Sequence, residues 1–151
     1  MEGGTVMDEG QEAAREARAA AAHAQRAALE RAEAEESARA RVLVAQFVEQ
    51  ARAAGIEPVP LRAKSYGGSG SYRTGLTGWY LQPKGSLAIG EDGEFYVLTA
   101  AGGPLAMLRG VTLEPRDPQL TVGRGARDGE SMSLAELLQR RLAAGSDFKR
   151  F

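Results

Sequence analysis

The segment whose residue types most suggest a binding loop is SYGGSGSYRTG, residues 65–75. Glycine-rich loops bind phosphate when their backbone N–H groups point at it from the start of a helix. The P-loop pattern G-x-x-x-x-G-K-[S/T] does not occur in the chain. The dinucleotide pattern G-x-G-x-x-G fails because Arg73 stands at the position of its third glycine. The nucleophile-elbow pattern G-x-S-x-G around Ser69 fails because Ser71 stands at the position of its second glycine. Two interpretations of the segment stay open, a flexible connection or a mobile flap over a basic surface.

Metal and catalytic chemistry have few residues available in this chain. It contains no cysteine and a single histidine, His23, which excludes thiolate ligands and cysteine nucleophiles. The acids Glu91, Asp92 and Glu94 stand together at a predicted hairpin, but they lack the alternating ligand spacing of a calcium loop. We therefore expect a protein that is not an enzyme and that holds no metal and no cofactor.

Residues 58–90 combine four cations with aromatic side chains and contain no acid. Such a patch can bind single-stranded nucleic acid, because cations contact phosphates and each ring stacked on a base contributes about 1–3 kcal/mol. The same residue types also anchor protein–protein interfaces. The candidate binding residues are Arg62, Lys64, Tyr66, Tyr72, Arg73, Tyr80 and Lys84.

Alternation in GWYL, residues 78–81, predicts the placement of two rings. In a strand Trp79 points to one face and Tyr80 to the other, so Trp79 is predicted to belong to the core rather than to a ligand platform. Tyr66 and Tyr72 are flanked by glycine. These two tyrosines are expected either to be exposed and contact a partner or to cover the edge of the sheet.

The N-terminal third of the chain has the composition of a long helix. Residues 8–54 contain no proline and only Gly10 as a breaker, and they are rich in Ala, Glu, Arg and Gln, which predicts one long helix or two in series. Leu29 is the only large apolar residue between positions 11 and 40. Residues 1–40 are therefore predicted to be a solvent-exposed arm, since no apolar stripe can dock them on a core.

Residues 41–54 of this helical region differ because they carry an apolar stripe. Val44, Phe47, Val48 and Ala51 recur at helical spacing. The stripe predicts that the last turns of the helix pack on the folded domain, and a glycine followed by two prolines ends the helix.

The middle of the chain has the shorter period of strands. Segments 78–82, 86–90 and 94–100 predict an antiparallel meander with a hairpin signal at Asp92–Gly93. Segment 104–115 is predicted to be one bent strand or two short ones with a bulge at Gly110. A further strand is predicted in residues 119–123.

A C-terminal helix is predicted over residues 133–144, because Ser133 and Glu136 form a capping box ahead of a leucine-rich face. The predicted fold is α+β, with a five- or six-stranded antiparallel meander packed by helices 41–54 and 133–144. Curling of the meander into a half-closed or closed barrel is the alternative. The expected organisation is a helical arm, 1–40, a compact domain, 41–145, and a flexible tail, 146–151.

The net charge of −1 argues against a protein whose whole surface binds nucleic acid. No secretory signal and no apolar run of about 18 residues occurs, so we expect a cytoplasmic protein that does not enter a membrane. The leading hypothesis is a non-catalytic bacterial interaction or adaptor module with a helical association arm, bound to a protein partner or to itself. The alternative is a nucleic-acid-binding domain that uses the patch at 62–84.

Overall fold

The computed structural model describes residues 2–67, 70–123 and 131–148, with side chains from residue 8 onward. It confirms the predicted α+β class. The chain divides into two units, Met1–Glu36 and Ser37–Phe151.

A single uninterrupted helix, α1, runs from Glu2 to Ala53. Within the first unit, every described side chain from Asp8 to Arg26 is exposed, and Leu29 is 57% exposed. These residues form a helix without a buried face, in keeping with their lack of an apolar stripe.

The part of α1 that belongs to the second unit has a buried face. Val44, Phe47 and Ala51 are each 1% exposed or less, as the helical spacing predicts, and Val48 is half-buried. Ala40 is fully buried, although it was predicted to belong to the exposed arm. Gly55 ends the helix with a φ of 73°, a conformation that glycine adopts without strain.

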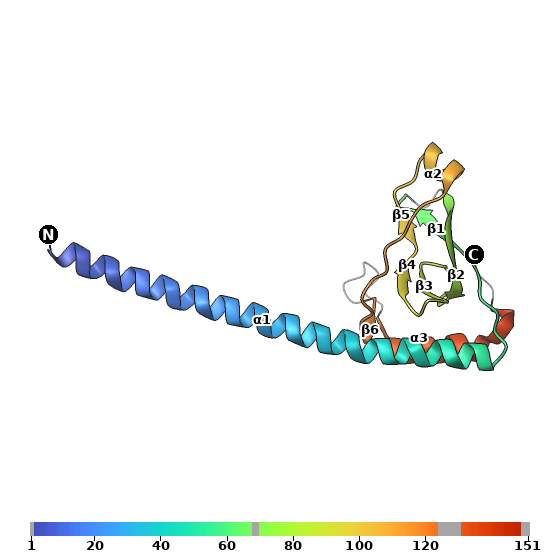
Figure 1. Ribbon diagram of the computed structural model, residues 1–151, viewed down its shortest axis with the longest axis horizontal. Coiled ribbons are helices and arrows are strands. Elements are labelled where there is room, and N and C mark those ends of the chain that lie inside the picture. Colours follow the sequence, from blue (N-terminus) through green and yellow to red (C-terminus); the bar gives the residue numbers. More distant parts are fainter. Residues whose placement is uncertain (1, 68–69, 124–130, 149–151) are drawn as a thin grey trace. The chain divides into compact units, whose positions relative to one another are not determined.

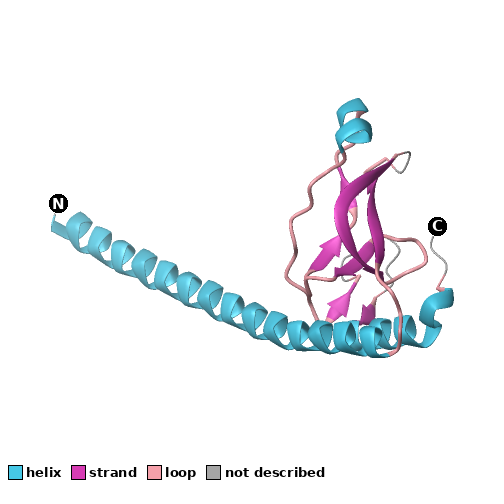
Figure 2. Cartoon of the chain, turned by 45° about the vertical axis from the view of Figure 1, so that its right-hand side comes forward, coloured by secondary structure: helices cyan, strands magenta, loops and turns pink. Residues whose placement is uncertain are grey.

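The second unit contains one five-stranded sheet, shown in Figures 1 and 2. Its strands lie in the order β4-β3-β2-β1-β5, and the sheet is not closed into a barrel. A separate pair is formed by β6 and β7. The strand bounds are β1 Val59–Ser65, β2 Ser71–Tyr80, β3 Leu87–Gly90, β4 Phe95–Val97, β5 Thr99–Ala100, β6 Thr121–Val122 and β7 Met132–Ser133.

The sheet is mixed, which corrects the prediction of an entirely antiparallel meander. After β4 the chain crosses to the opposite edge of the sheet, where β5 pairs with β1 in parallel. Segment 94–100 therefore supplies two strands at two edges rather than one continuous strand.

Segment 104–115 is a further error of the strand prediction. Its first part forms a short helix, α2, Pro104–Arg109, and Gly110 caps this helix instead of forming a bulge. Proline at the first helical position is preorganised for a helix, and Leu, Ala, Met and Arg are good helix formers. These local preferences prevail because none of the residues of α2 is buried in the sheet.

The C-terminal helix α3, Leu134–Ala144, begins and ends as predicted. The Ser133 hydroxyl accepts a hydrogen bond from the backbone N–H of Glu136 at 3.1 Å. A single 3₁₀ turn, η1, Gly145–Asp147, follows. Phe148 packs on Arg141 with its ring centroid 4.1 Å from the guanidinium carbon, and the flexible tail 146–151 stays a prediction. Residues 149–151 lie outside the described residues.

Apolar side chains pack on both faces of the sheet. On one face Trp79 and Ile89 join Phe47 of α1 and Leu134 of α3 in one cluster, and Figure 1 shows α3 beside the last turns of α1. On the other face Tyr80 packs in a second cluster that includes Leu61, Ala88, Tyr96 and Leu98. The predicted alternation of Trp79 and Tyr80 is confirmed.

The buried side chains of the second unit begin at Ala40. We therefore expect a chain truncated to residues 37–151 to keep its fold and its free energy of unfolding, because Ser37 is also a favoured N-cap residue for the shortened helix. Urea denaturation of both chains, followed by circular dichroism, measures this. A loss of more than about 1 kcal/mol on truncation would contradict the division into two units.

Gly78 lies opposite Gly90 where β2 pairs with β3. A Cβ at Gly78 would collide with the carbonyl oxygen of Ile89 and come within 2.7 Å of the Cα of Gly90. Gly78→Ala should lower the free energy of unfolding by about 1–3 kcal/mol, since backbone atoms would have to move. The matched control is Gly67→Ala, where a Cβ meets nothing within 4 Å and little change is expected. Equal effects of the two variants in urea denaturation would contradict this packing.

Candidate interaction surface

The β1–β2 hairpin gathers three of the predicted binding cations on one face. Arg62 lies directly opposite Arg73 in the antiparallel register, and Lys64 lies opposite Ser71. Side chains of opposed residues, and of residues two apart on one strand, share a face. The residue between the cations, Ala63, lies opposite Tyr72 and faces the other way.

Hydrogen bonds to neutral groups position these cations. The guanidinium of Arg62 donates from Nε to the Ser71 hydroxyl at 2.8 Å and from Nη2 to the Ser71 carbonyl at 3.0 Å. The Lys64 ammonium donates to the backbone carbonyl of Lys84 at 2.7 Å, which places the turn containing Lys84 beside the hairpin. None of Arg62, Lys64, Arg73 and Lys84 forms an ion pair with an acid in the described part of the chain. Their positive charges are therefore available to a partner.

Two of the predicted aromatic contacts are buried and do not belong to the surface. Tyr72 is 5% exposed and Tyr80 is 3% exposed. The Tyr80 hydroxyl accepts a hydrogen bond from the backbone N–H of Arg62 at 2.7 Å, next to the point where the β1–β2 register shifts. These rings support the hairpin from the inside. Tyr66, in the turn after β1, is 75% exposed and remains a surface residue.

Arg73 connects the hairpin to α2. Its Nη2 donates to the carbonyl of Leu108 at 2.9 Å, and its own carbonyl accepts from the backbone N–H of Val111 at 2.8 Å. A cation beside the last carbonyls of a helix is also favoured by the helix dipole. The position of α2 on the hairpin thus depends on both the side chain and the backbone of Arg73.

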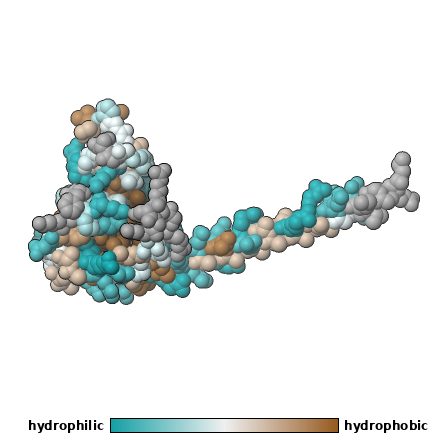
Figure 3. Space-filling view, turned by 180° about the vertical axis from the view of Figure 1, so that it is seen from behind, coloured by the Kyte–Doolittle hydropathy of each residue, from teal (hydrophilic) through white to brown (hydrophobic). Residues whose placement is uncertain are grey.

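Three large aliphatic side chains of α2 are exposed, and none of them was predicted as a binding residue. Leu105 is 66% exposed, Met107 68% and Leu108 72%. Together with the adjacent cations Arg73 and Arg109 they are called the α2 tip here. Figure 3 shows brown, apolar atoms at the end of the unit that carries α2. The signal in the sequence is the run PLAMLR between Gly103 and Gly110, for which one bent strand or two short ones were predicted.

The acidic residues at the predicted hairpin form hydrogen bonds and ion pairs with other residues of the second unit. Asp92 accepts hydrogen bonds from the backbone N–H of Glu94 at 2.9 Å and from the Tyr96 hydroxyl at 2.7 Å. The pKa of Tyr96 is raised to about 12, mainly because its hydroxyl is buried and secondly because it donates a hydrogen bond to the Asp92 carboxylate. Glu94 pairs with Arg41 at 3.3 Å, and Glu91 lies 3.7 Å from Arg52. The carboxylates are thus spread over different partners.

Comparison of the chain with protein-family models, with curated proteins and with solved structures gave no match. Among the residues that the structure describes, no group of His, Cys, Asp or Glu side chains could hold a metal ion. None of the described helices combines the length and apolar character that a membrane crossing requires.

Tyr80→Phe should lower the free energy of unfolding by about 1 kcal/mol, because the backbone N–H of Arg62 loses its acceptor in a partly buried position. Tyr66→Phe is the matched control, since that ring is exposed and its change should be near zero. Urea denaturation monitored by circular dichroism compares the two variants. If Tyr66→Phe cost as much as Tyr80→Phe, the assignment of Tyr80 to the interior of the hairpin would be wrong.

Proposed function

We propose that this protein is a non-catalytic interaction module that binds another protein through the α2 tip. The observation that carries this proposal is the cluster of Leu105, Met107 and Leu108, each about two-thirds exposed or more on one helix of six residues. Clustered apolar exposure of this kind is typical of interaction sites, whereas single exposed apolar residues are ordinary.

The energetics favour an interface role for these side chains. Because α2 has no buried residue, its apolar side chains add little to the stability of the fold. Each would contribute about 1.5–3 kcal/mol if a partner removed it from water. Arg73 and Arg109 flank them, and a cationic rim around an apolar centre is a common arrangement at protein interfaces.

The expected partner carries an acidic rim around an apolar pocket. The cations of the hairpin and of α2 have no acidic counterpart among the described residues, so a negatively charged surface would be complementary. Residues 1–40 are proposed to act as a spacer or association arm. A bacterial source and a cytoplasmic location are part of the same hypothesis.

Nucleic acid is the second candidate, supported by the cations that gather around Arg62. Stacking on bases needs exposed ring faces, and Tyr72, Trp79 and Tyr80 are all buried. Only Tyr66 of the four rings in this region is exposed, which favours a protein partner. Anisotropy titrations of a labelled oligonucleotide at low and high salt separate the two, since binding through phosphates weakens steeply with salt.

The test replaces Leu105, Met107 and Leu108 together by serine in the full-length chain. The triple variant should keep its free energy of unfolding within about 0.5 kcal/mol, since all three are exposed. A photo-crosslinking amino acid at position 107 should form an adduct with a protein partner in cells, and the adduct should be lost when Leu105 and Leu108 are serine. The matched control is the same crosslinker at Val42, which is 56% exposed.

Identical adducts from positions 107 and 42, or no adduct from position 107, would contradict the proposed interface. Strong, salt-sensitive oligonucleotide binding that is lost on replacing Arg62, Lys64, Arg73 and Lys84 together would favour the nucleic-acid function instead.

A further inference from the structure

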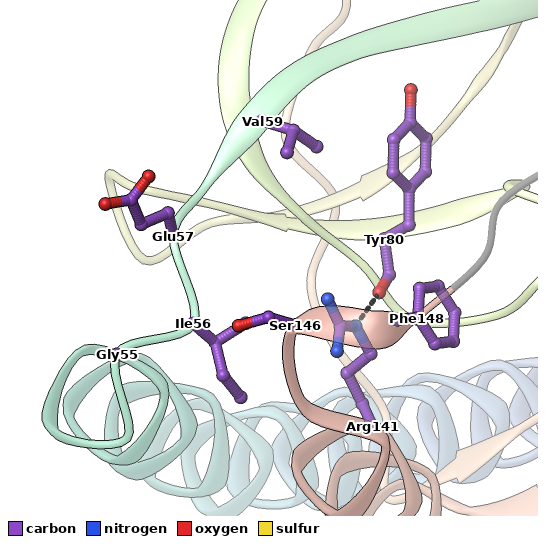
Figure 4. Close-up of a pocket in the computed structure, with 8 residues that line it drawn as sticks. All are labelled: Gly55, Ile56, Glu57, Val59, Tyr80, Arg141, Ser146 and Phe148. Atoms are coloured by element: carbon purple, nitrogen blue, oxygen red, sulfur yellow. Dashed lines mark hydrogen bonds between the residues drawn. The ribbon is translucent and has the colours of Figure 1, made fainter.

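Arg141 in the last turn of α3 is a buried cation. The residue is only 7% exposed, and its side chain points towards the end of β2 rather than into solvent, as Figure 4 shows. Its Nε donates to the carbonyl of Tyr80 at 2.7 Å, and its Nη1 donates to the carbonyl of Gly145 at 2.9 Å. The Phe148 ring covers the guanidinium, with 4.1 Å between the Cζ atom and the ring centroid.

No carboxylate neutralises this guanidinium within the described residues. Both of its hydrogen-bond acceptors are neutral carbonyl groups. Burial accordingly lowers the pKa of Arg141, because desolvation disfavours the charged form. A guanidinium has five N–H donors, and the two bonds to Tyr80 and Gly145 leave the Nη2 group without an acceptor in the described chain.

The remaining donors face a cavity of about 500 Å³, a volume in the range of small-molecule pockets. Its walls come from the α1–β1 connection, the end of β2 and the turn that follows α3. Val59 and Phe148 supply apolar surface, and Ser146 supplies a hydroxyl. In Figure 4 the carboxylate of Glu57 points away from Arg141. The residues lining the cavity are Gly55, Ile56, Glu57, Val59, Tyr80, Arg141, Ser146 and Phe148.

We propose that this cavity binds a monocarboxylate with an apolar body. The carboxylate would pair with the free Nη edge of Arg141, whose fork of donors matches the two oxygens of a carboxylate. The apolar body would lie against Val59. A single negative charge fits better than a phosphate, because the site offers one cation and has Glu57 at its wall. None of the α2 tip residues lines this cavity, so the two proposals are independent.

The carboxylate could belong to a free organic acid or to the C-terminus of a peptide. Hexanoate serves as the probe for the first source, and the N-acetylated dipeptide Ala-Leu with a free C-terminus serves for the second. The neutral counterparts are hexanamide and the same dipeptide with an amidated C-terminus. Whichever acid binds more tightly identifies the source.

The test is a titration of the full-length chain, followed by the NMR signals of the Arg141 side-chain Nε–H and of the Ser146 amide. We expect at least one acid to shift both signals and to bind about tenfold more tightly or better than its amide, since a charge-assisted pair is lost in the amide. Equal affinity of acid and amide, or no shift with either acid, would overturn the proposal.

Three variants check the mode of binding. Arg141→Met should abolish binding of the acid. Val59→Trp should also abolish binding, because the larger side chain fills the cavity from a strand residue that is 41% exposed. If Arg141→Met does not fold, Val59→Trp alone tests whether the acid binds in this cavity. Glu57→Gln is the matched control, which should leave the affinity unchanged or increase it because a like charge is removed. Retained binding in Val59→Trp, or weaker binding in Glu57→Gln, would contradict the proposed site.

Discussion

The indole of Trp79 holds the sheet of the second unit to its helices. It is 1% exposed, and its Nε1–H donates to the carbonyl of Ile56 at 2.9 Å, which satisfies the polar atom of a buried ring. Phe47 meets it edge-on with ring centroids 5.9 Å apart, and Arg52 lies over its face at 5.5 Å. One side chain of β2 therefore contacts the end of α1 and the turn that leads into β1.

The position of Trp79 also determines which face of the sheet its neighbour Tyr80 packs on. Strand alternation turns Tyr80 to the opposite face, where its hydroxyl accepts from Arg62 of β1 while its carbonyl accepts from Arg141 of α3. At the other end of β2, Arg73 holds α2 through its carbonyl and its guanidinium. The two proposed binding sites thus lie near opposite ends of one strand, each attached to it by hydrogen bonds.

Patterns of short range in the sequence predicted much of this fold, including the capped C-terminal helix, the stop at Gly55 and the opposite placement of Trp79 and Tyr80. The parallel pairing of β5 with β1 could not be predicted in this way, because it depends on contacts between distant segments. The burial of Tyr72 has a similar cause, since its hydroxyl packs against Gly102 as well as Gly70. Of the residues predicted to form a binding surface, the four cations and Tyr66 are still candidates. The α2 tip could not be predicted, because residues 104–109 were expected to form a strand and form a helix instead.

The most direct test of the central role of Trp79 is hydrogen exchange of its indole N–H, which gives a unique NMR signal because the chain has one tryptophan. If the bond to Ile56 joins sheet and helix, this proton should exchange as slowly as the backbone amides of β2 and β3, through global unfolding alone. Exchange at the rate of an exposed indole while those amides stay protected would show that the helix separates from the sheet, contrary to the structure.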